Sequence, residues 1–349
     1  MKRFAYIELD THAELANNFY ELTKDFETVS VDFYFSEKIF QLLNIHNKNV
    51  FQTGQSQLLE LLEKQNYALI IIGTVHRHFN FYKLIVDRFK TAILVHNLNF
   101  TKATKWVFFK SVFKRDFTYR LKLLFKESLL DAPRIYQMSK YLLGIDASIS
   151  EKNHLEFLPL FFNQFEEQKP EKENITIIIP GAVSQARRDY KSTLEKLKNF
   201  KNIGIQYEVI LLGKASGKEL ENLKSSIKQL PEFIKVQFFE HKIPQQAFDD
   251  WMLTADVLYC PIQSNTDFFS IPEIYGQTKI SGNIGDAIKY GKPAIFPAIY
   301  KSDSEFILQE KPDLQTQFLE VMTARYNFSN FSRKKISEAV SDVLLYKLT

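Results

Sequence analysis

The feature that most constrains this chain is an alternation of apolar, strand-like runs with segments of helical spacing. In the first half the apolar runs are 4–9, 29–35, 67–73 and 91–95. The third of these is continuously apolar, as a strand covered on both faces of a parallel sheet requires. The alternation therefore predicts an α/β fold in which helices cover both faces of a parallel sheet.

A second alternating series begins after residues 163–174, which are polar and charged and form the best linker candidate. Its apolar runs are 175–179, 207–212, 234–239, 256–260 and 294–296. The prediction is two doubly wound, Rossmann-like domains, 1–163 and 175–331, with a linker at 164–174 and a C-terminal helix at 332–349. Such domains bind ligands at the carboxyl ends of their strands, so two facing domains would bind in a central cleft.

Composition indicates a cellular setting. The 349 residues include one cysteine, Cys260, so no disulfide framework can form within a monomer and a reducing cytoplasm is expected. The N-terminus shows no signal-peptide pattern, and no apolar run reaches the roughly 18 residues of a membrane-spanning helix. The net charge of +4 gives no indication of a nucleic-acid partner.

Histidines gather at the predicted strand ends of the first domain. His12 follows the first apolar run, His76 and His78 follow the third, and His96 with Asn97 follows the fourth. Because the carboxyl ends of parallel strands share one edge, these side chains are predicted to face the cleft. Their spacing differs from that of a zinc site and no cysteine joins them, so no metal is expected.

Residues 273–293 are predicted to form a polar, glycine-rich loop, a short helix and a strand. The loop contains Lys279, Ser281 and Gly282, and the helix is expected at 283–290. The free N–H groups at a helix N-terminus favour an anion, and a phosphate is the natural ligand.

Other residues at strand ends of the second domain extend this candidate site. The adjacent Arg187 and Arg188, together with Lys279, supply cations suited to a diphosphate. Glu273 and Asp286 suit ribose or sugar hydroxyls, since carboxylates accept paired hydrogen bonds. The residues predicted to bind such a diphosphate-containing ligand are Gly181, Arg187, Arg188, Gly213, Lys214, Glu273, Lys279, Ser281, Gly282, Asn283 and Asp286.

Several of these segments resemble the GT-B glycosyltransferases, the group that includes glycogen-synthase-like and lipopolysaccharide-type enzymes. The resemblance is strongest over roughly 175–297, where the basic loop 180–188 stands in the expected place. The matching segments are Glu273-Ile-Tyr-Gly276, Asp286-Ala-Ile-Lys-Tyr-Gly291-Lys292-Pro293, Ala255-Asp256-Val257 to Pro261, Thr11-His12-Ala-Glu14 and Val95-His96-Asn97. This chain departs from the family in an insertion, Gln-Thr-Lys-Ile-Ser-Gly, between the two acidic residues.

The resemblance implies a GT-B fold and a metal-independent, hexosyltransferase-type glycosyltransferase. Such an enzyme moves a sugar from a nucleotide-diphospho-sugar to a glycan or lipid-linked acceptor in cell-surface polysaccharide biosynthesis, with retention at the anomeric carbon. No cofactor is expected. Arg188 and Lys279 are expected to stabilise the departing diphosphate, assisted by Arg187, Ser281 and the N–H groups after Gly282. Asp286 or Glu273 would bind ribose, His96 or His12 would meet the sugar or acceptor hydroxyl, and Glu14, His76, His78 and Asn97 would complete the acceptor side.

Three other interpretations stay open. A nucleotide-sugar epimerase on the same fold would also use cleft histidines and carboxylates. A non-catalytic GT-B-like scaffold would bind a partner and no nucleotide. The chain could also be an unrelated two-domain α/β protein, in which case the resemblance carries no functional meaning.

Residues 102–126 are basic and aromatic, with eight cations, seven aromatic rings and one acid, Asp116. Cations interleaved with Trp and Phe suit an anionic membrane surface, at the inner face of the membrane. The alternative is a helical pair that packs its rings onto the first sheet and leaves its lysines in solvent. Nucleic acid could use such a patch, but nothing else in the sequence supports that partner.

Overall fold

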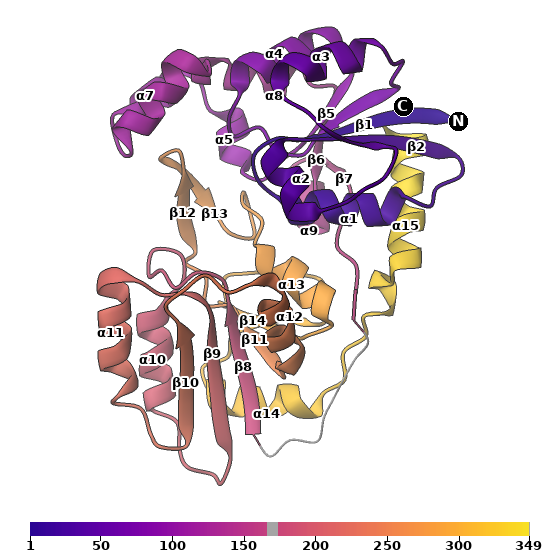
Figure 1. Ribbon diagram of the computed structural model, residues 1–349. Coiled ribbons are helices and arrows are strands. Elements are labelled where there is room, and N and C mark those ends of the chain that lie inside the picture. Colours follow the sequence, from indigo (N-terminus) through magenta and orange to yellow (C-terminus); the bar gives the residue numbers. More distant parts are fainter. Residues whose placement is uncertain (166–173, 349) are drawn as a thin grey trace.

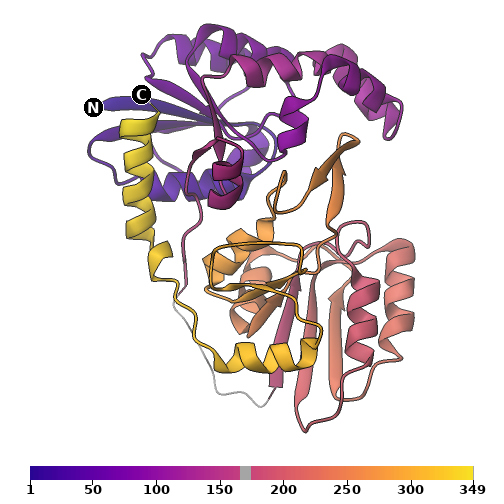
Figure 2. The same cartoon turned by 180° about the vertical axis from the view of Figure 1, so that it is seen from behind.

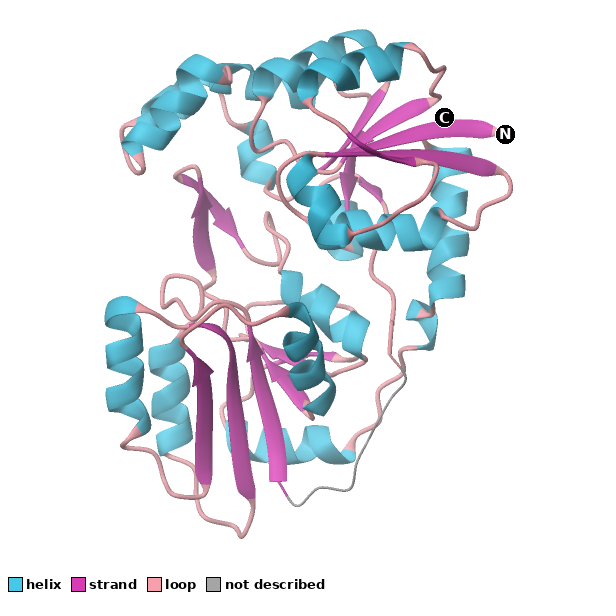
Figure 3. Cartoon of the chain, viewed as in Figure 1, coloured by secondary structure: helices cyan, strands magenta, loops and turns pink. Residues whose placement is uncertain are grey.

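Two parallel sheets, one in each half of the chain, form the framework of the protein (Figures 1 and 3). The computed structural model describes residues 1–165 and 174–348. Each sheet is covered by helices on both faces, as the alternation of apolar runs predicts. Residues 166–173 of the predicted linker lie outside the described residues.

The first sheet contains seven strands in the order β3-β2-β1-β4-β5-β6-β7, and all neighbours run parallel. Its strands are β1 (Lys2–Glu8), β2 (Val29–Phe35), β3 (Val50–Gln52), β4 (Leu69–Ile72), β5 (Thr91–Leu94), β6 (Tyr141–Gly144) and β7 (Glu156–Phe157). Its helices are α1 (Ala13–Thr23), α2 (Glu37–Leu43), α3 (Gln55–Glu63), α4 (Phe79–Arg88), α5 (Leu98–Lys102), α6 (Lys105–Val112), α7 (Phe117–Lys126), α8 (Ala132–Met138) and α9 (Ala147–Lys152). The strand order reverses between β1 and β4, and such a switch point opens a crevice for ligands.

The second sheet contains six parallel strands in the order β10-β9-β8-β11-β14-β15. Its strands are β8 (Asn174–Pro180), β9 (Gln206–Lys214), β10 (Ile234–Phe239), β11 (Val257–Tyr259), β14 (Ala294–Phe296) and β15 (Ile307–Gln309). The helices that follow are α10 (Tyr190–Lys198), α11 (Gly217–Ile227), α12 (Gln245–Thr254), α13 (Gly282–Tyr290) and α14 (Leu314–Thr323). Strand β15 adds an edge that the sequence interpretation did not include.

An antiparallel hairpin of β12 (Asn265–Phe268) and β13 (Ile271–Ile274) rises from the second domain towards the first (Figure 1). It corrects the prediction for the start of 273–293, because Glu273 belongs to a strand rather than to a loop. Phe268 packs against Phe100, with ring centroids 4.9 Å apart, and the side chain of Asn99 donates to the carbonyl of Pro272 at 2.8 Å. The hairpin therefore joins the two domains.

The end of the chain returns to the first domain (Figure 2). Helix α15 (Arg333–Asp342) lies against α1, where Arg333 and Ser337 donate to the carbonyls of Glu21 and Leu22. The apolar residues of this segment join the core beneath the first sheet; they are Ile336, Val340, Val343, Leu344 and Leu348. The predicted C-terminal helix is thus part of the N-terminal domain.

Candidate active site

A cavity of about 250 Å³ lies where the loops of the second domain face α1 of the first domain. Eight residues predicted from the sequence line it: Glu14, Gly181, Arg187, Arg188, Ser281, Gly282, Asn283 and Asp286. Four lining residues were not predicted: Phe248, Ile262, Tyr275 and Ile280. Tyr275 and Ile280 lie inside the stretch that the sequence singled out, whereas Phe248 comes from a helix without any motif.

The N-terminus of α13 opens onto this cavity. Ser281 is the N-cap residue, and its hydroxyl accepts a hydrogen bond from the backbone N–H of Asn283 at 3.3 Å. Gly291 ends the helix in the left-handed conformation that glycine commonly adopts at a C-cap. With Gly282 lining the cavity, the first turn of the helix directs its partial positive charge at any ligand there.

Arg188 lies in the β8–α10 loop and reaches across to α13. Its Nη2 donates to Oδ1 of Asn283 at 3.2 Å, and its buried Nε has no hydrogen-bond partner among the described residues. Gly181 makes room for it: φ is +102°, and a Cβ there would lie 2.4 Å from Nη2. Arg187 is more exposed and lines the same cavity. The paired arginines thus place positive charge opposite the helix N-terminus.

Lys279 connects this cavity to the histidines of the first domain. Its backbone forms an antiparallel bridge with Asn97, and its Nζ lies 5.6 Å from the ring centroid of Tyr275. Burial lowers the pKa of Lys279, and no carboxylate of the described chain lies within ion-pair distance of its ammonium. The charges of Glu273 and Asp267 act on Lys279 from beyond ion-pair distance, so this half-buried ammonium remains able to pair with an anionic ligand.

Three of the four predicted histidines meet at the carboxyl ends of β1, β4 and β5. The rings of His12 and His96 stack with centroids 4.1 Å apart, and His76 lies 5.7 Å from His96. Nε2 of His96 donates to the carbonyl of Gly73 at 2.8 Å, so its Nδ1 keeps the lone pair. Desolvation, aided by the charge of Lys279, lowers the pKa of His96 to about 4. The pKa of His12, whose side chain is more exposed, is lowered too, by desolvation and then by the charges of His96 and Lys279. Both rings are therefore neutral at pH 7 and can accept a proton or a hydrogen bond.

The other predicted residues of the first domain are placed differently. Nδ2 of Asn97 lies 3.5 Å from Nε2 of His76, and its buried Oδ1 has no partner in the described chain. His78 stands apart, at the N-terminus of α4, where its backbone N–H donates to Glu127 at 2.7 Å. Across the described residues, no group of three or more His, Cys, Asp or Glu side chains is arranged to hold a metal ion.

Glu273 is fully buried in the hairpin and points at the first domain. Its carboxylate accepts from the backbone N–H groups of Phe100 at 2.9 Å and Asn99 at 3.3 Å, in the first turn of α5. Burial raises its pKa, and these hydrogen bonds oppose the rise. The structure places this carboxylate on the domain interface rather than on the cavity, although the sequence grouped it with Asp286.

Gly213 and Lys214 lie outside the cavity. A Cβ on Gly213 would lie 2.2 Å from the carbonyl oxygen of Gly181, so this glycine allows β9 and the arginine loop to approach closely. Lys214 is exposed at the end of β9.

Asp286 and Glu14 face the cavity from opposite domains. Nδ2 of Asn283 donates to Asp286 at 2.9 Å. Burial, followed by the charge of Glu14, raises the pKa of Asp286 to about 7. Asp286 therefore becomes a full acceptor for ligand hydroxyls only as the pH rises through neutrality.

This shift predicts how the Asp286→Asn variant depends on pH. A raised pKa means that the folded protein binds the proton more tightly than the unfolded chain, so stability is lost as the pH rises from about 4 to about 7. Asn does not ionise. The unfolding free energy of Asp286→Asn, measured by urea titration, should therefore rise relative to wild type across that range. The exposed Asp250→Asn variant is the control, and a difference for Asp286→Asn that is independent of pH would contradict the assignment.

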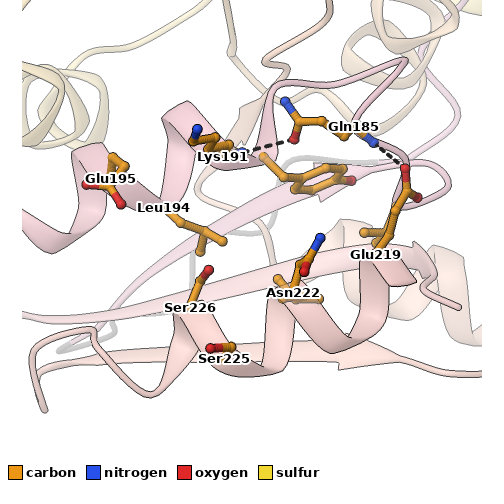
Figure 4. A pocket seen from close by; sticks show the side chains of 11 residues that line it. Gln185, Lys191, Leu194, Glu195, Glu219, Asn222, Ser225 and Ser226 are labelled. Atoms are coloured by element: carbon orange, nitrogen blue, oxygen red, sulfur yellow. Dashed lines mark hydrogen bonds between the residues drawn. The ribbon is translucent and has the colours of Figure 1, made fainter. Parts of the chain in front are cut away.

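A larger cavity, about 450 Å³, lies between α10 and α11 (Figure 4). Gln185 organises its upper rim: its backbone N–H donates to Glu219 at 2.9 Å, and its side-chain oxygen accepts from the N–H of Lys191 at 3.0 Å. None of the residues predicted to bind a donor or an acceptor lines this cavity. The cavity of about 250 Å³ is the candidate active site because eight of the predicted residues line it.

No protein-family model and no curated protein matches this chain in sequence. Solved structures do match it. The lipopolysaccharide outer core galactosyltransferase WaaB has a TM-score of 0.58 at 10% identity, covering 99% of each chain. An α-glucosyltransferase in complex with UDP has a TM-score of 0.56 at 10% identity, covering 97% of this chain and 95% of the other. A Listeria monocytogenes protein described as a UDP-N-acetylglucosamine 2-epimerase has a TM-score of 0.50 at 10% identity, covering 99% and 97%.

These similarities extend over nearly the whole chain and identify the fold as GT-B. The fold predicted from the alternating runs and from the resemblance is thereby confirmed. At 10% identity the similarity establishes no donor, acceptor or reaction.

Proposed function

We propose that this protein is a glycosyltransferase that moves a sugar from a nucleotide-diphospho-sugar to a hydroxyl of an acceptor. One observation carries the proposal: the paired arginines and the N-terminus of α13 converge on one cavity, beside Lys279, which has no carboxylate partner in the described chain. Two arginines, a lysine with no carboxylate of the described chain at ion-pair distance and a helix N-terminus suit a diphosphate, while Asp286 and Glu14 on the same lining suit hydroxyl groups.

The arrangement gives each group a role. Arg188 and Lys279 stabilise the charge that develops on the departing diphosphate, with Arg187, Ser281 and the first N–H groups of α13 assisting. Asp286 accepts hydrogen bonds from the ribose.

The histidines supply the acceptor side. His96 presents the lone pair of Nδ1 towards the sugar or the acceptor hydroxyl, and His12 stacks against it. Both rings are neutral at pH 7, so they can accept a hydrogen bond from the attacking hydroxyl or take the proton that it loses. The ring of His76 lies next to that of His96, and Asn97 contacts both His76 and the backbone of Lys279. These two residues position the histidine rings.

The test of the donor site is a thermal-shift panel of UDP-, GDP-, ADP- and CMP-sugars. We expect at least one class to raise the melting temperature, by an amount that increases with the logarithm of its concentration above Kd, because a ligand that binds only the folded state stabilises it. Stabilisation should be lost in Arg188→Ala. No response to any nucleotide-sugar would favour the non-catalytic scaffold.

A nucleotide-sugar epimerase is the second candidate, because an epimerase structure shares the fold over 99% of this chain. The two reactions differ in their products. A transferase releases nucleoside diphosphate only when an acceptor is supplied, whereas an epimerase yields the isomeric nucleotide-sugar without an acceptor. Chromatography of the nucleotide pool distinguishes them.

Metal independence is a further expectation of this proposal. If cations and a helix N-terminus balance the diphosphate charge, turnover should survive EDTA with little change. Activity with and without added manganese or magnesium, after dialysis against the chelator, measures this. Complete loss in EDTA with recovery on adding metal would overturn the metal-independent mechanism.

The proposed acceptor is a glycan or a lipid-linked saccharide in cell-surface polysaccharide biosynthesis, and the proposed location is the cytoplasm at the inner face of the membrane. No helix within the described residues has the length and apolar character needed to span a bilayer. Retention at the anomeric carbon belongs to the proposal through the resemblance, and NMR of the product linkage would test it.

A further inference from the structure

Helices α6 and α7 carry an unusual concentration of exposed aromatic side chains. Within the described chain, every exposed phenylalanine and tryptophan lies between residues 106 and 125. The exposed set is Trp106, Phe109, Phe113, Phe117, Tyr119 and Phe125, and we call it the aromatic surface. Trp106 is 61% exposed and Phe125 77%. The alternative in which these rings pack onto the first sheet is therefore wrong for this set.

Four of these rings form one continuous strip. Successive ring centroids are 5.7 Å apart for Trp106 and Phe109, 5.4 Å for Phe109 and Phe113, and 5.8 Å for Phe113 and Phe117. A contiguous apolar strip of this kind, rimmed by charge, is typical of an interaction site rather than of an ordinary monomer surface.

The rim of the aromatic surface is positively charged. Seven exposed cations border it: Lys102, Lys105, Lys110, Lys114, Arg115, Lys122 and Lys126. Asp116 is the only acidic residue in 102–126. Arg115 pairs with Asp267 of the hairpin at 3.6 Å, and Lys110 lies 5.0 Å from the ring centroid of Trp106. The surface therefore favours a negatively charged partner that also accepts apolar rings.

The opposite side of the two helices is firmly attached to the protein. Phe108, Val112 and Leu123 are fully buried in the first domain. Arg120 donates to the carbonyl of Ser111 at 2.6 Å and to the hydroxyl of Ser270 in the hairpin at 2.7 Å. Helix α7 thus lies beside the hairpin tip (Figures 1 and 2).

We propose that the aromatic surface docks on an anionic lipid bilayer and brings a lipid-linked acceptor to the cleft; the second half of this statement rests on the proposed function. Rings that enter the headgroup region and lysines that meet anionic lipids are the two features of an interfacial amphipathic helix. Duplex DNA would use the lysines through its phosphates but would leave the phenylalanines in water.

The experiment is co-sedimentation with vesicles of phosphatidylcholine alone or mixed with phosphatidylglycerol. We expect the wild-type protein to pellet only with the anionic vesicles and to be released by salt. The triple variant Lys105→Glu, Lys110→Glu, Lys114→Glu should bind at least about tenfold more weakly, since each basic residue near the surface contributes to the attraction. The matched control is Lys218→Glu, Lys228→Glu, Lys235→Glu, with the same charge change on exposed lysines of the second domain, and it should bind like wild type.

A second measurement reports insertion of the rings. With Trp251→Phe, Trp106 is the only tryptophan left, and its fluorescence should shift to the blue on adding anionic vesicles. Three results would overturn the docking proposal: wild-type protein that stays in the supernatant at low salt, an unshifted Trp106, or salt-sensitive binding to duplex DNA without binding to vesicles. Donor stabilisation in the thermal-shift panel is independent of these outcomes, so failure of the membrane surface and failure of the transferase can be told apart.

Discussion

Arg188→Ala and Lys279→Ala are each expected to lower turnover by about 30- to 1000-fold. The two cations lie next to the site proposed for the diphosphate, and each would lose a charge-assisted contact that strengthens as the leaving group gains charge. Losses of that kind cost roughly 2–4 kcal/mol of transition-state stabilisation. Steady-state kinetics with the nucleotide-sugar found in the thermal-shift panel measures kcat and KM separately.

Conservative and distant replacements make this test specific. Arg188→Lys keeps the charge but loses the fork that reaches Asn283, so it should fall between wild type and Arg188→Ala. Arg325→Ala, an exposed arginine of the second domain, should behave like wild type. Unaltered kcat and donor affinity in both Arg188→Ala and Lys279→Ala would remove these residues from the mechanism.

Glu273→Ala is expected to destabilise the protein by about 2–6 kcal/mol. It would leave the N–H groups of Asn99 and Phe100 without their acceptor, and each unsatisfied buried donor costs about 1–3 kcal/mol. Urea or thermal unfolding without nucleotide measures the loss. Glu273→Gln retains one acceptor oxygen and should lose less. Glu240→Ala, which breaks an exposed ion pair with Lys224, should change stability by about 1 kcal/mol or less.

The same variants decide between two roles for Glu273. The sequence suggested that either this residue or Asp286 binds the ribose. If Glu273→Ala weakens donor binding while the unfolding free energy stays at the wild-type value, Glu273 contacts the donor. If stability falls and the residual folded protein keeps its donor affinity, the residue acts by holding α5 against the hairpin.

The sequence predicted the two sheets because most of their strands are apolar runs. In these segments the tertiary contacts stabilise the same strand conformation that the local pattern favours. It also predicted that His12, His76 and His96 converge, since residues that follow parallel strands must share one edge. Their neutral state depends on burial and on Lys279, which approaches from the other domain. The local sequence pattern does not show how deeply the rings are buried or that Lys279 approaches them.

The hairpin shows where sequence reasoning stops. Residues 265–274 have no alternating pattern, and their turn places Phe269 and Ser270, rather than glycine, at positive φ. Contacts of Phe268 and Ile271 with the first domain hold the strands in place. The contacting residues of the first domain lie far away in the sequence. The orientation of Glu273 follows from those contacts and so could not be predicted either.

The return of α15 to the first domain affects how this protein can fold while the ribosome synthesises it. Residues 1–162 leave the ribosome long before 333–348, yet Val340 and Leu344 are fully buried against that early half. The apolar surface of the first domain that α15 covers therefore stays exposed while the whole second domain is synthesised. A nascent chain stalled before residue 333 would carry a complete second domain and an incomplete first domain, and its exposed apolar surface would be a binding site for chaperones.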